Sequence, residues 1–208
     1  MTIRSKKDLE VRLSKLQNFE NPSQKLEQYA TPSPIAGEWL WTMFMKQEIQ
    51  GKIVLDAACG PGILGLGSLL LGAKKVFFVD KDRDVLNICK KNYQGLAKEY
   101  HLGKAVFMCK DISAFNEKVD VVIQNPPFGT KLKHADKEFL EKAFSLAPLV
   151  YSMHKLSTTR FVEAVAGDYG FTITQVWRYD FPLKAIFSFH RKPLRKIDVG
   201  LWRMEIVK

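Results

Sequence analysis

A glycine-rich turn between an apolar strand and a helix is the feature that most constrains how this chain can fold. The residues after Ile53-Val54-Leu55 read Asp-Ala-Ala-Cys-Gly-Pro-Gly-Ile-Leu-Gly, so that Gly60, Gly62 and Gly65 spell G-x-G-x-x-G. A strand, such a turn and a helix form the first unit of a doubly wound α/β fold, in which the backbone of the turn approaches a bound cofactor.

The rest of the chain continues the alternation of strands and helices. Short apolar runs predict strands at 53–55, 76–79, 105–109, 119–123 and 149–153. The segments that follow predict helices through 71 and over 82–100, 136–147 and 157–169. Two final segments, 171–179 and 197–207, alternate with period two and have no helix between them, which predicts an antiparallel hairpin at one edge. We therefore expect a Rossmann-like, mostly parallel sheet of seven strands, covered by helices on both faces.

The N-terminal quarter precedes this core. Ser5 is positioned to cap a helix with leucines at 9, 13 and 16. Ser33 and Pro34 are typical of a cap and a first helical residue, and predict a second helix to about Ile49. We expect one domain over 1–208, with an N-terminal helical extension (1–50) and a Rossmann-like core (51–208).

Composition limits the class of partner. The 32 Lys and Arg residues against 22 Asp and Glu give a net charge of +10, which favours nucleic acid or an anionic membrane surface. The longest uncharged run, 57–73, contains five glycines and is shorter than the roughly 20 apolar residues of a membrane span. Because no basic amphipathic helix with an apolar face carries the C-terminal charges, we expect no membrane association. The three cysteines form no C-x-x-C pair and the four histidines have no ligand spacing. The sequence thus predicts a cytoplasmic protein without a metal site.

Two acidic residues narrow the identity of the cofactor. Asp80 follows Gly62 by 18 residues, at the end of the second strand, where a carboxylate can bind ribose hydroxyls. Asp56 directly precedes the turn, where it would repel a pyrophosphate at the helix N-terminus and attract a cation. The pattern favours S-adenosyl-L-methionine, with its methionine ammonium, over a dinucleotide. A turn that binds nothing is the alternative.

The tetrapeptide Asn125-Pro126-Pro127-Phe128 follows the fourth predicted strand, which we expect beside the first. The amide oxygen of Asn125 and the carbonyl of Pro126 can accept the two hydrogens of an exocyclic amine, which turns its lone pair towards a methyl donor. The ring of Phe128 can stack on the base. The alternative is a proline turn that ends a strand.

With both motifs in place, the chain resembles the N6-adenine methyltransferases of the class I fold. It is most similar to the methyltransferase-like protein 5 family of small-subunit rRNA adenosine methyltransferases and their archaeal relatives. The matching segments are Leu26-Glu27-Gln28-Tyr29 with Thr31, Asn125 to Thr130, Val150-Tyr151-Ser152 with His154-Lys155, and Phe189 to Lys192. The resemblance implies N6-methylation of an adenosine in small-subunit rRNA. Guanine-N2 and protein-glutamine methyltransferases share the Asn-Pro-Pro-Phe signature and stay open, as does a non-catalytic RNA-binding protein on the same scaffold.

The resemblance also implies roles for individual residues. The catalytic residues would be Asn125, Pro126, Pro127 and Phe128. Gln28, Tyr29 and Thr31 would contact the cofactor, with Gln28 and Thr31 at its methionine end; Asp80 would hold its ribose, and Asp111 and Ile112 its adenine. The turn would contribute Asp56, Ala58, Gly60, Pro61, Gly62 and Ile63. Ala58 departs from the family, which usually has its first glycine there.

Basic and aromatic residues near the C-terminus predict where RNA binds. From Lys184 to the end there are seven basic residues against two acidic ones, interleaved with Phe187, Phe189 and His190. The RNA-binding candidates are Lys131, Lys133, His154, Lys155, Phe189, His190, Arg191 and Lys192.

The resemblance further implies a partner protein. Family members work with a small zinc-binding activator subunit that adds a strand to the edge of the sheet. The third strand, Ala105 to Cys109, is apolar and is the expected edge. Cover by a helix of the same chain is the alternative.

Overall fold

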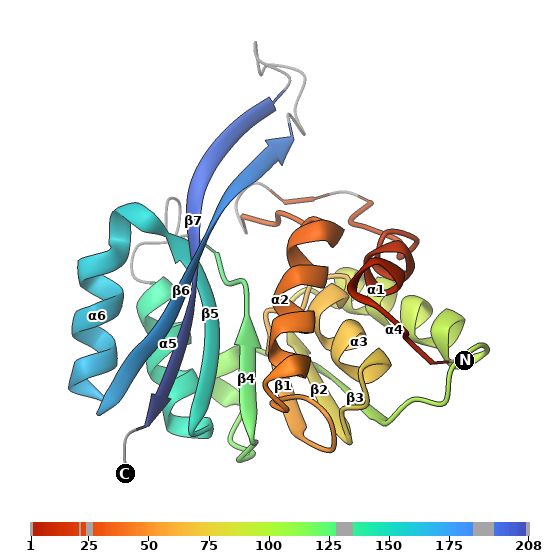
Figure 1. Ribbon diagram of the computed structural model, residues 1–208, viewed down its shortest axis with the longest axis horizontal. Coiled ribbons are helices and arrows are strands. Elements are labelled where there is room, and N and C mark those ends of the chain that lie inside the picture. Colours follow the sequence, from red (N-terminus) through yellow and green to blue (C-terminus); the bar gives the residue numbers. More distant parts are fainter. Residues whose placement is uncertain (1, 21, 24–26, 128–134, 185–193, 207–208) are drawn as a thin grey trace.

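The computed structural model describes residues 2–20, 22–23, 27–127, 135–184 and 194–206, and is built around one seven-stranded sheet (Figure 1). The strand order is β3-β2-β1-β4-β5-β7-β6. Five strands are parallel: β1 (Ile53–Ala57), β2 (Lys75–Asp80), β3 (Lys104–Cys109), β4 (Val121–Gln124) and β5 (Leu149–Lys155). The hairpin of β6 (Phe171–Lys184) and β7 (Leu194–Ile206) is antiparallel, with β7 next to β5. The predicted Rossmann-like sheet with an antiparallel edge is confirmed, and so is the position of β4 beside β1.

Helices cover both faces of the sheet. On one face lie α2 (Ser33–Met45), α3 (Ile63–Leu70) and α4 (Arg83–Ala97), with α1 (Lys6–Leu13) packed on α2 and α3. On the other lie α5 (Ala135–Leu146) and α6 (Thr159–Asp168). Two short 3-10 helices, η1 (Ile112–Ala114) and η2 (Leu156–Thr158), complete the elements.

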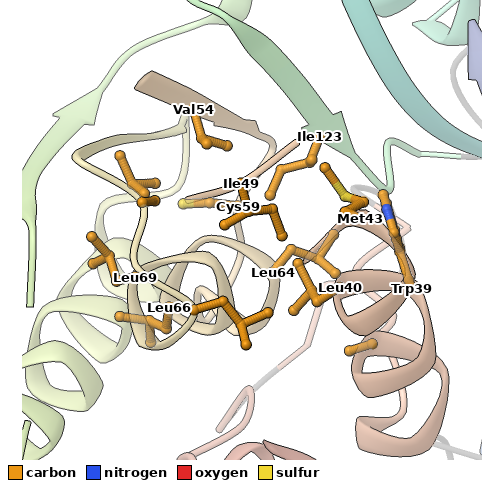
Figure 2. Packing of buried hydrophobic residues seen from close by; sticks show 14 of the residues in the cluster. Trp39, Leu40, Met43, Ile49, Val54, Cys59, Leu64, Leu66, Leu69 and Ile123 are labelled. Carbon is orange, nitrogen blue, oxygen red and sulfur yellow. The ribbon is translucent and has the colours of Figure 1, made fainter. Parts of the chain in front are cut away.

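Alternate residues of each strand build two separate cores. Val54 and Ile123 point to the α2/α3 side, where Figure 2 shows them with Leu40 and Leu64. Leu55 and Val122, the next residues along, point to the side of α5 and α6. The first core thus fixes the strands and helices that flank the glycine turn. It also holds α2 in place, because Trp39, Leu40 and Met43 are fully buried there.

Some predicted element boundaries were wrong, and each shift has a local cause. Pro32, not Ser33, is the N-cap of α2, and the helix ends at Met45 because Gln47 adopts a left-handed backbone with φ of 60°. The strand β4 begins at Val121, since the N–H of Val119 donates to the carbonyl of Leu146 outside the ladder. Ser5 caps α1 as predicted, accepting from the N–H of Asp8 at 3.1 Å.

The hairpin is longer than predicted. β6 continues to Lys184 and β7 begins at Leu194, so the two strands extend well past the other strands of the sheet (Figure 1). Phe181 and Val199 are fully buried in the stem. The side chain of Pro182 reaches the larger cavity described below, so the hairpin stem forms part of its wall.

The uncharged run 57–73 forms the end of β1, the glycine turn and the eight-residue helix α3. Leu64, Leu66 and Leu69 of that helix are buried in the core. Across the described ranges, none of the helices has the length and apolar character needed to span a membrane.

Candidate active site

The turn between β1 and α3 has a left-handed backbone at three positions. The φ angles are 55° at Ala58, 53° at Gly60 and 92° at Gly62. Ala58 is therefore in a conformation that costs a residue with a Cβ about 1–2 kcal/mol, a cost that glycine would not have. Gly62 has a second constraint, because a Cβ at this position would lie 2.3 Å from Sγ of Cys89 in α4. Its glycine lets α4 pack directly against the turn.

Two carboxylates hold this turn in shape. Asp56, at the end of β1, accepts from the N–H of Gly65 at 2.7 Å. Asp80, at the end of β2, accepts from the N–H of Gly60 and of Asp82, both at 2.9 Å. Burial raises the pKa of Asp56 to about 8 and also raises the pKa of Asp80, against the lowering effect of these hydrogen bonds. Both carboxyls therefore resist ionisation, and a nearby positive charge would favour their ionised form.

Two cavities meet at the carboxyl ends of β1, β2 and β4. The larger, about 650 Å³, is lined by residues that include Asp56, Thr31 and Asn125. The smaller, about 280 Å³, is lined by residues that include Asp80, Asp111 and Asn125. Both cavities share a wall formed by Phe19, Gln28, Tyr29, Ala58, Gly60 and Asn125. The expectation that Asp56 and Asn125 open onto one crevice, at the switch point of the sheet, is confirmed.

The segment before α2 lies across the glycine turn. The amide of Asn92 in α4 accepts from the N–H of Gln17 at 2.8 Å and donates to the carbonyls of Gln17 and Pro61, at 2.9 and 3.0 Å. The ring of Phe19 lies against Gly60, where a Cβ would come within 3.0 Å of it. This segment therefore forms a wall of the crevice.

Gln28 ties the same segment to the end of β2. Its Nε2 donates to Asp82 Oδ2 at 2.8 Å, and its Oε1 accepts from the N–H of Ser23 at 2.7 Å. Asp82 is the N-cap of α4 and accepts there from the backbone of Asp84 and Val85. The side chain of Gln28 is thus fixed two residues from Asp80.

Asn125 is held by one hydrogen bond on one side of its amide. Its Nδ2 donates to Oγ1 of Thr31 at 3.0 Å, and Thr31 is buried. Its Oδ1 is buried and has no partner among the described residues. A buried amide oxygen without a partner is costly, of the order of 1–3 kcal/mol, unless a ligand supplies the donor. The crevice is therefore suited to a ligand with an N–H group.

Eleven of the twelve predicted cofactor residues line one of the two cavities, namely Gln28, Tyr29, Thr31, Asp56, Ala58, Gly60, Pro61, Ile63, Asp80, Asp111 and Ile112. Gly62 lines neither cavity and faces Cys89, so its glycine is explained by packing. Asp111 caps η1 and accepts from Ser113 backbone and side chain, which lowers the pKa of its carboxyl. Of the tetrapeptide, Pro127 lines the smaller cavity and Pro126 is buried, while Phe128 lies outside the described residues.

The prediction that His154 contacts RNA is inconsistent with its position. Its side chain is 2% exposed, its Nε2 is 2.6 Å from Oγ of Ser152, and its ring packs on Trp202. Burial lowers the pKa of this imidazole to about 3, so it carries no positive charge for a phosphate. Lys155, the next residue, is half-buried at the end of β5. The other RNA candidates, Lys131, Lys133, Phe189, His190, Arg191 and Lys192, lie outside the described residues.

Several residues that line the crevice were not predicted. They include Phe19, Val79, Lys81, Lys110, Glu138 and Phe139, all at the smaller cavity. Val79, Lys81 and Lys110 flank the predicted Asp80 and Asp111, so their positions could have been inferred as neighbours. Phe19 follows no periodic pattern, and Phe139 reads as an ordinary apolar position of α5. Nothing in the sequence marks either as part of a site.

This sheet order, with an antiparallel β7 and a crevice between β1 and β4, defines the protein as an S-adenosylmethionine-dependent methyltransferase of class I. The chain belongs to the METTL5 family and its archaeal relatives, and the family described as conserved hypothetical protein 95 matches residues 38–164. The rRNA N6-adenosine methyltransferase METTL5 of Danio rerio is 36% identical over 95% of this chain and 97% of its own length. The uncharacterized protein MJ0284 of Methanocaldococcus jannaschii is 35% identical over 96% and 94% of the two chains. The crystal structure of PH1948 from Pyrococcus horikoshii is 40% identical and superimposes with a TM-score of 0.90 over the whole of both chains.

Proposed function

We propose that this protein transfers a methyl group from S-adenosyl-L-methionine to N6 of an adenosine in small-subunit ribosomal RNA. The observation that carries the proposal is the side chain of Asn125, which lines the same crevice as Asp56 and whose buried Oδ1 has no donor in the described chain. The METTL5 relative that is named an rRNA N6-adenosine methyltransferase supports the choice of substrate.

The residues of the crevice fit this cofactor. Asp56 lines the larger cavity and can provide a carboxylate for an ammonium group, whose charge would favour the ionised form. Asp80 can accept from ribose hydroxyls, while Asp111 and Ile112 border the smaller cavity where the adenine would lie. When bound, the cofactor supplies an electrophilic methyl group on its sulfonium.

Catalysis would rest on the acceptors at the end of β4. The lone pair of an adenine amine is delocalised into the ring, so the amine is a poor nucleophile. Acceptance of its two hydrogens by Asn125 Oδ1 and the carbonyl of Pro126 would localise that lone pair, with no general base required. We expect Phe128 to stack on the extruded base.

We further propose that RNA contacts Lys155 and the basic segment from Lys184 onwards. Lys155 is the last residue of β5, which runs parallel to β4, so it lies at the carboxyl end of the sheet, where the crevice opens. Phosphate contacts of this kind make affinity strongly dependent on salt, so affinity for RNA should fall steeply as salt is raised.

A small zinc-binding activator subunit is proposed to pair with β3. This strand is at the edge of the sheet, and its central residues Ala105 to Met108 are half-buried. An open apolar edge strand promotes aggregation unless a partner covers it. The protein expressed alone should therefore aggregate and become soluble with the activator, whereas a stable soluble monomer at high concentration would contradict this.

The decisive experiment incubates the purified protein with methyl-labelled S-adenosylmethionine and either rRNA or a ribosomal protein extract, followed by mass spectrometry of nucleosides and peptides. We expect label in N6-methyladenosine of small-subunit rRNA. Label confined to guanine-N2 or to a protein glutamine would replace the proposed substrate. Calorimetry that detected no cofactor binding would favour a non-catalytic RNA-binding protein.

A further inference from the structure

The side chain of Thr31 is buried and closely constrained by its neighbours in the chain. The residue is 6% exposed and directly precedes Pro32, the N-cap of α2. A residue before proline is restricted to extended backbone, and a β-branched side chain has few rotamers. Because Leu40 and Met43 anchor α2 in the core, the hydroxyl has a defined position at the crevice.

That hydroxyl is the partner of the catalytic amide in the described structure. Asn125, which lines both cavities, donates from Nδ2 to Thr31 Oγ1 at 3.0 Å, and its buried Oδ1 has no partner among the described residues. An asparagine amide has two nearly isosteric ends, one that donates and one that accepts. Loss of the threonine hydroxyl would leave the buried Nδ2 unsatisfied, at a cost of about 1–3 kcal/mol, and would favour rotation of the amide.

We infer that Thr31 is a positioning residue, which fixes the amide of Asn125 through the Nδ2–Oγ1 hydrogen bond and so leaves Oδ1 for the substrate amine. This inference rests on the proposed function, in which Oδ1 accepts a hydrogen from that amine. It differs from the role implied by family resemblance, a contact with the methionine end of the cofactor. A cofactor contact sets KM for S-adenosylmethionine, whereas a positioning role sets kcat.

The test is a double-mutant cycle on methyl transfer to rRNA, with Thr31→Val, Asn125→Ala and the double variant. Valine keeps the shape of threonine and removes the acceptor. We expect Thr31→Val to lower kcat about 10-fold, equivalent to about 1.4 kcal/mol, with KM for S-adenosylmethionine changed less than about twofold. In the Asn125→Ala background the same change should have little further effect.

Two further variants separate positioning from loss of structure. Thr31→Ser keeps the hydroxyl and should recover most of kcat. Thr159→Val removes a half-buried threonine hydroxyl that donates to Leu156 at 2.7 Å, at the start of α6, and should leave both constants unchanged. Thermal unfolding of every variant shows which ones remain folded, and Thr31→Ala, which also removes the hydroxyl, replaces valine in the cycle if valine does not fold.

The possible outcomes distinguish this inference from the proposed function. A rise in KM with unchanged kcat, or an equal effect of Thr31→Val with and without Asn125, would overturn the positioning role. If the wild type methylates guanine-N2 or a protein glutamine, the adenosine proposal fails, yet the cycle still tests Thr31, since each acceptor presents an N–H. A wild type that transfers label to none of the three overturns both.

Discussion

The two sides of the crevice differ in how their polar groups are satisfied. On the cofactor side, at the ends of β1 and β2, the carboxylates of Asp56 and Asp80 accept hydrogen bonds from backbone N–H groups of the turn and the residues after it. On the acceptor side, at the end of β4, Oδ1 of Asn125 is buried, and within the described structure no donor reaches it.

The difference indicates that one side of the crevice serves cofactor binding and the other serves methyl transfer. The cofactor side is organised by its own backbone, so it should keep its shape whether or not a ligand is bound. The Asn125 oxygen on the acceptor side has a hydrogen bond still to be made, which a substrate amine can supply. A hydrogen bond to Asn125 that strengthens in the transition state lowers the activation free energy, whereas interactions on the cofactor side lower the free energy of cofactor binding.

The strongest test of this division is Asn125→Ala. Loss of one positioned acceptor should lower kcat by about 10²-fold or more, about 3 kcal/mol, while the dissociation constant of S-adenosylmethionine stays nearly unchanged. Single-turnover methyl transfer measures the first quantity and calorimetry the second. Equal losses in both would mean that Asn125 serves the cofactor as much as the substrate.

Gly62→Ala tests the preorganised turn itself. The new Cβ would meet Cys89 Sγ at 2.3 Å in a left-handed backbone, so overpacking and strain together should lower the free energy of unfolding by about 2–4 kcal/mol. Urea unfolding without ligand measures this loss.

Gly95→Ala is the matched control for that substitution. Gly95 lies inside α4 with no atom within 4 Å of an added Cβ, so alanine should stabilise the protein by about 0.5–1 kcal/mol. If both variants lost stability equally, the cause would lie in α4 and not in the turn.

Asn92→Ala tests whether the segment before α2 belongs to the preorganised side. The change removes three hydrogen bonds to Gln17 and Pro61 and should lower the free energy of unfolding by about 2 kcal/mol, while weakening cofactor binding. Urea unfolding and calorimetry measure the two effects.

Asn116→Ala is the control, because that side chain accepts an exposed hydrogen bond from Lys142 and its loss should cost less than about 0.5 kcal/mol. Unchanged cofactor affinity in Asn92→Ala would exclude the segment from the site.

The sheet and the crevice could be predicted from the sequence because they depend on local patterns. Apolar runs, the glycine turn and the order of strands and helices determine that β1 lies beside β4, and therefore that Asp56 and Asn125 meet. The element boundaries depend on individual backbone angles, such as the φ of 60° at Gln47, for which the sequence carries no periodic signal.

The contacts between distant residues could not be predicted in the same way. Thr31 and Asn125 are 94 positions apart, and Gln17 and Asn92 are 75 apart, so only the packed α2 and α4 bring them together. His154 shows the converse error. It lies in a segment similar to the family, but its inward face on β5 follows from strand register, which places it opposite Gly200 and against Trp202.

Asp56→Asn tests how much the ionisation of a buried carboxyl on the cofactor side costs the folded state. The pKa of Asp56 is about 8 in the folded chain and near 3.8 when unfolded, so between these values the folded state binds the extra proton. The free energy of unfolding should therefore fall as the pH rises towards 8, by at most about 1.4 kcal/mol per pH unit. Asparagine can still accept from Gly65 but does not titrate. In urea unfolding between pH 6 and 7.5, the free energy of unfolding of the variant should therefore depend less on pH than that of the wild type.

Saturating S-adenosylmethionine should also reduce the pH dependence of the wild type, because its ammonium favours the ionised carboxylate. If the free energy of unfolding depended equally on pH in wild type and variant, this carboxyl would be ionised without a ligand. The cofactor side would then resemble the acceptor side, since each would have a polar group whose partner is the ligand.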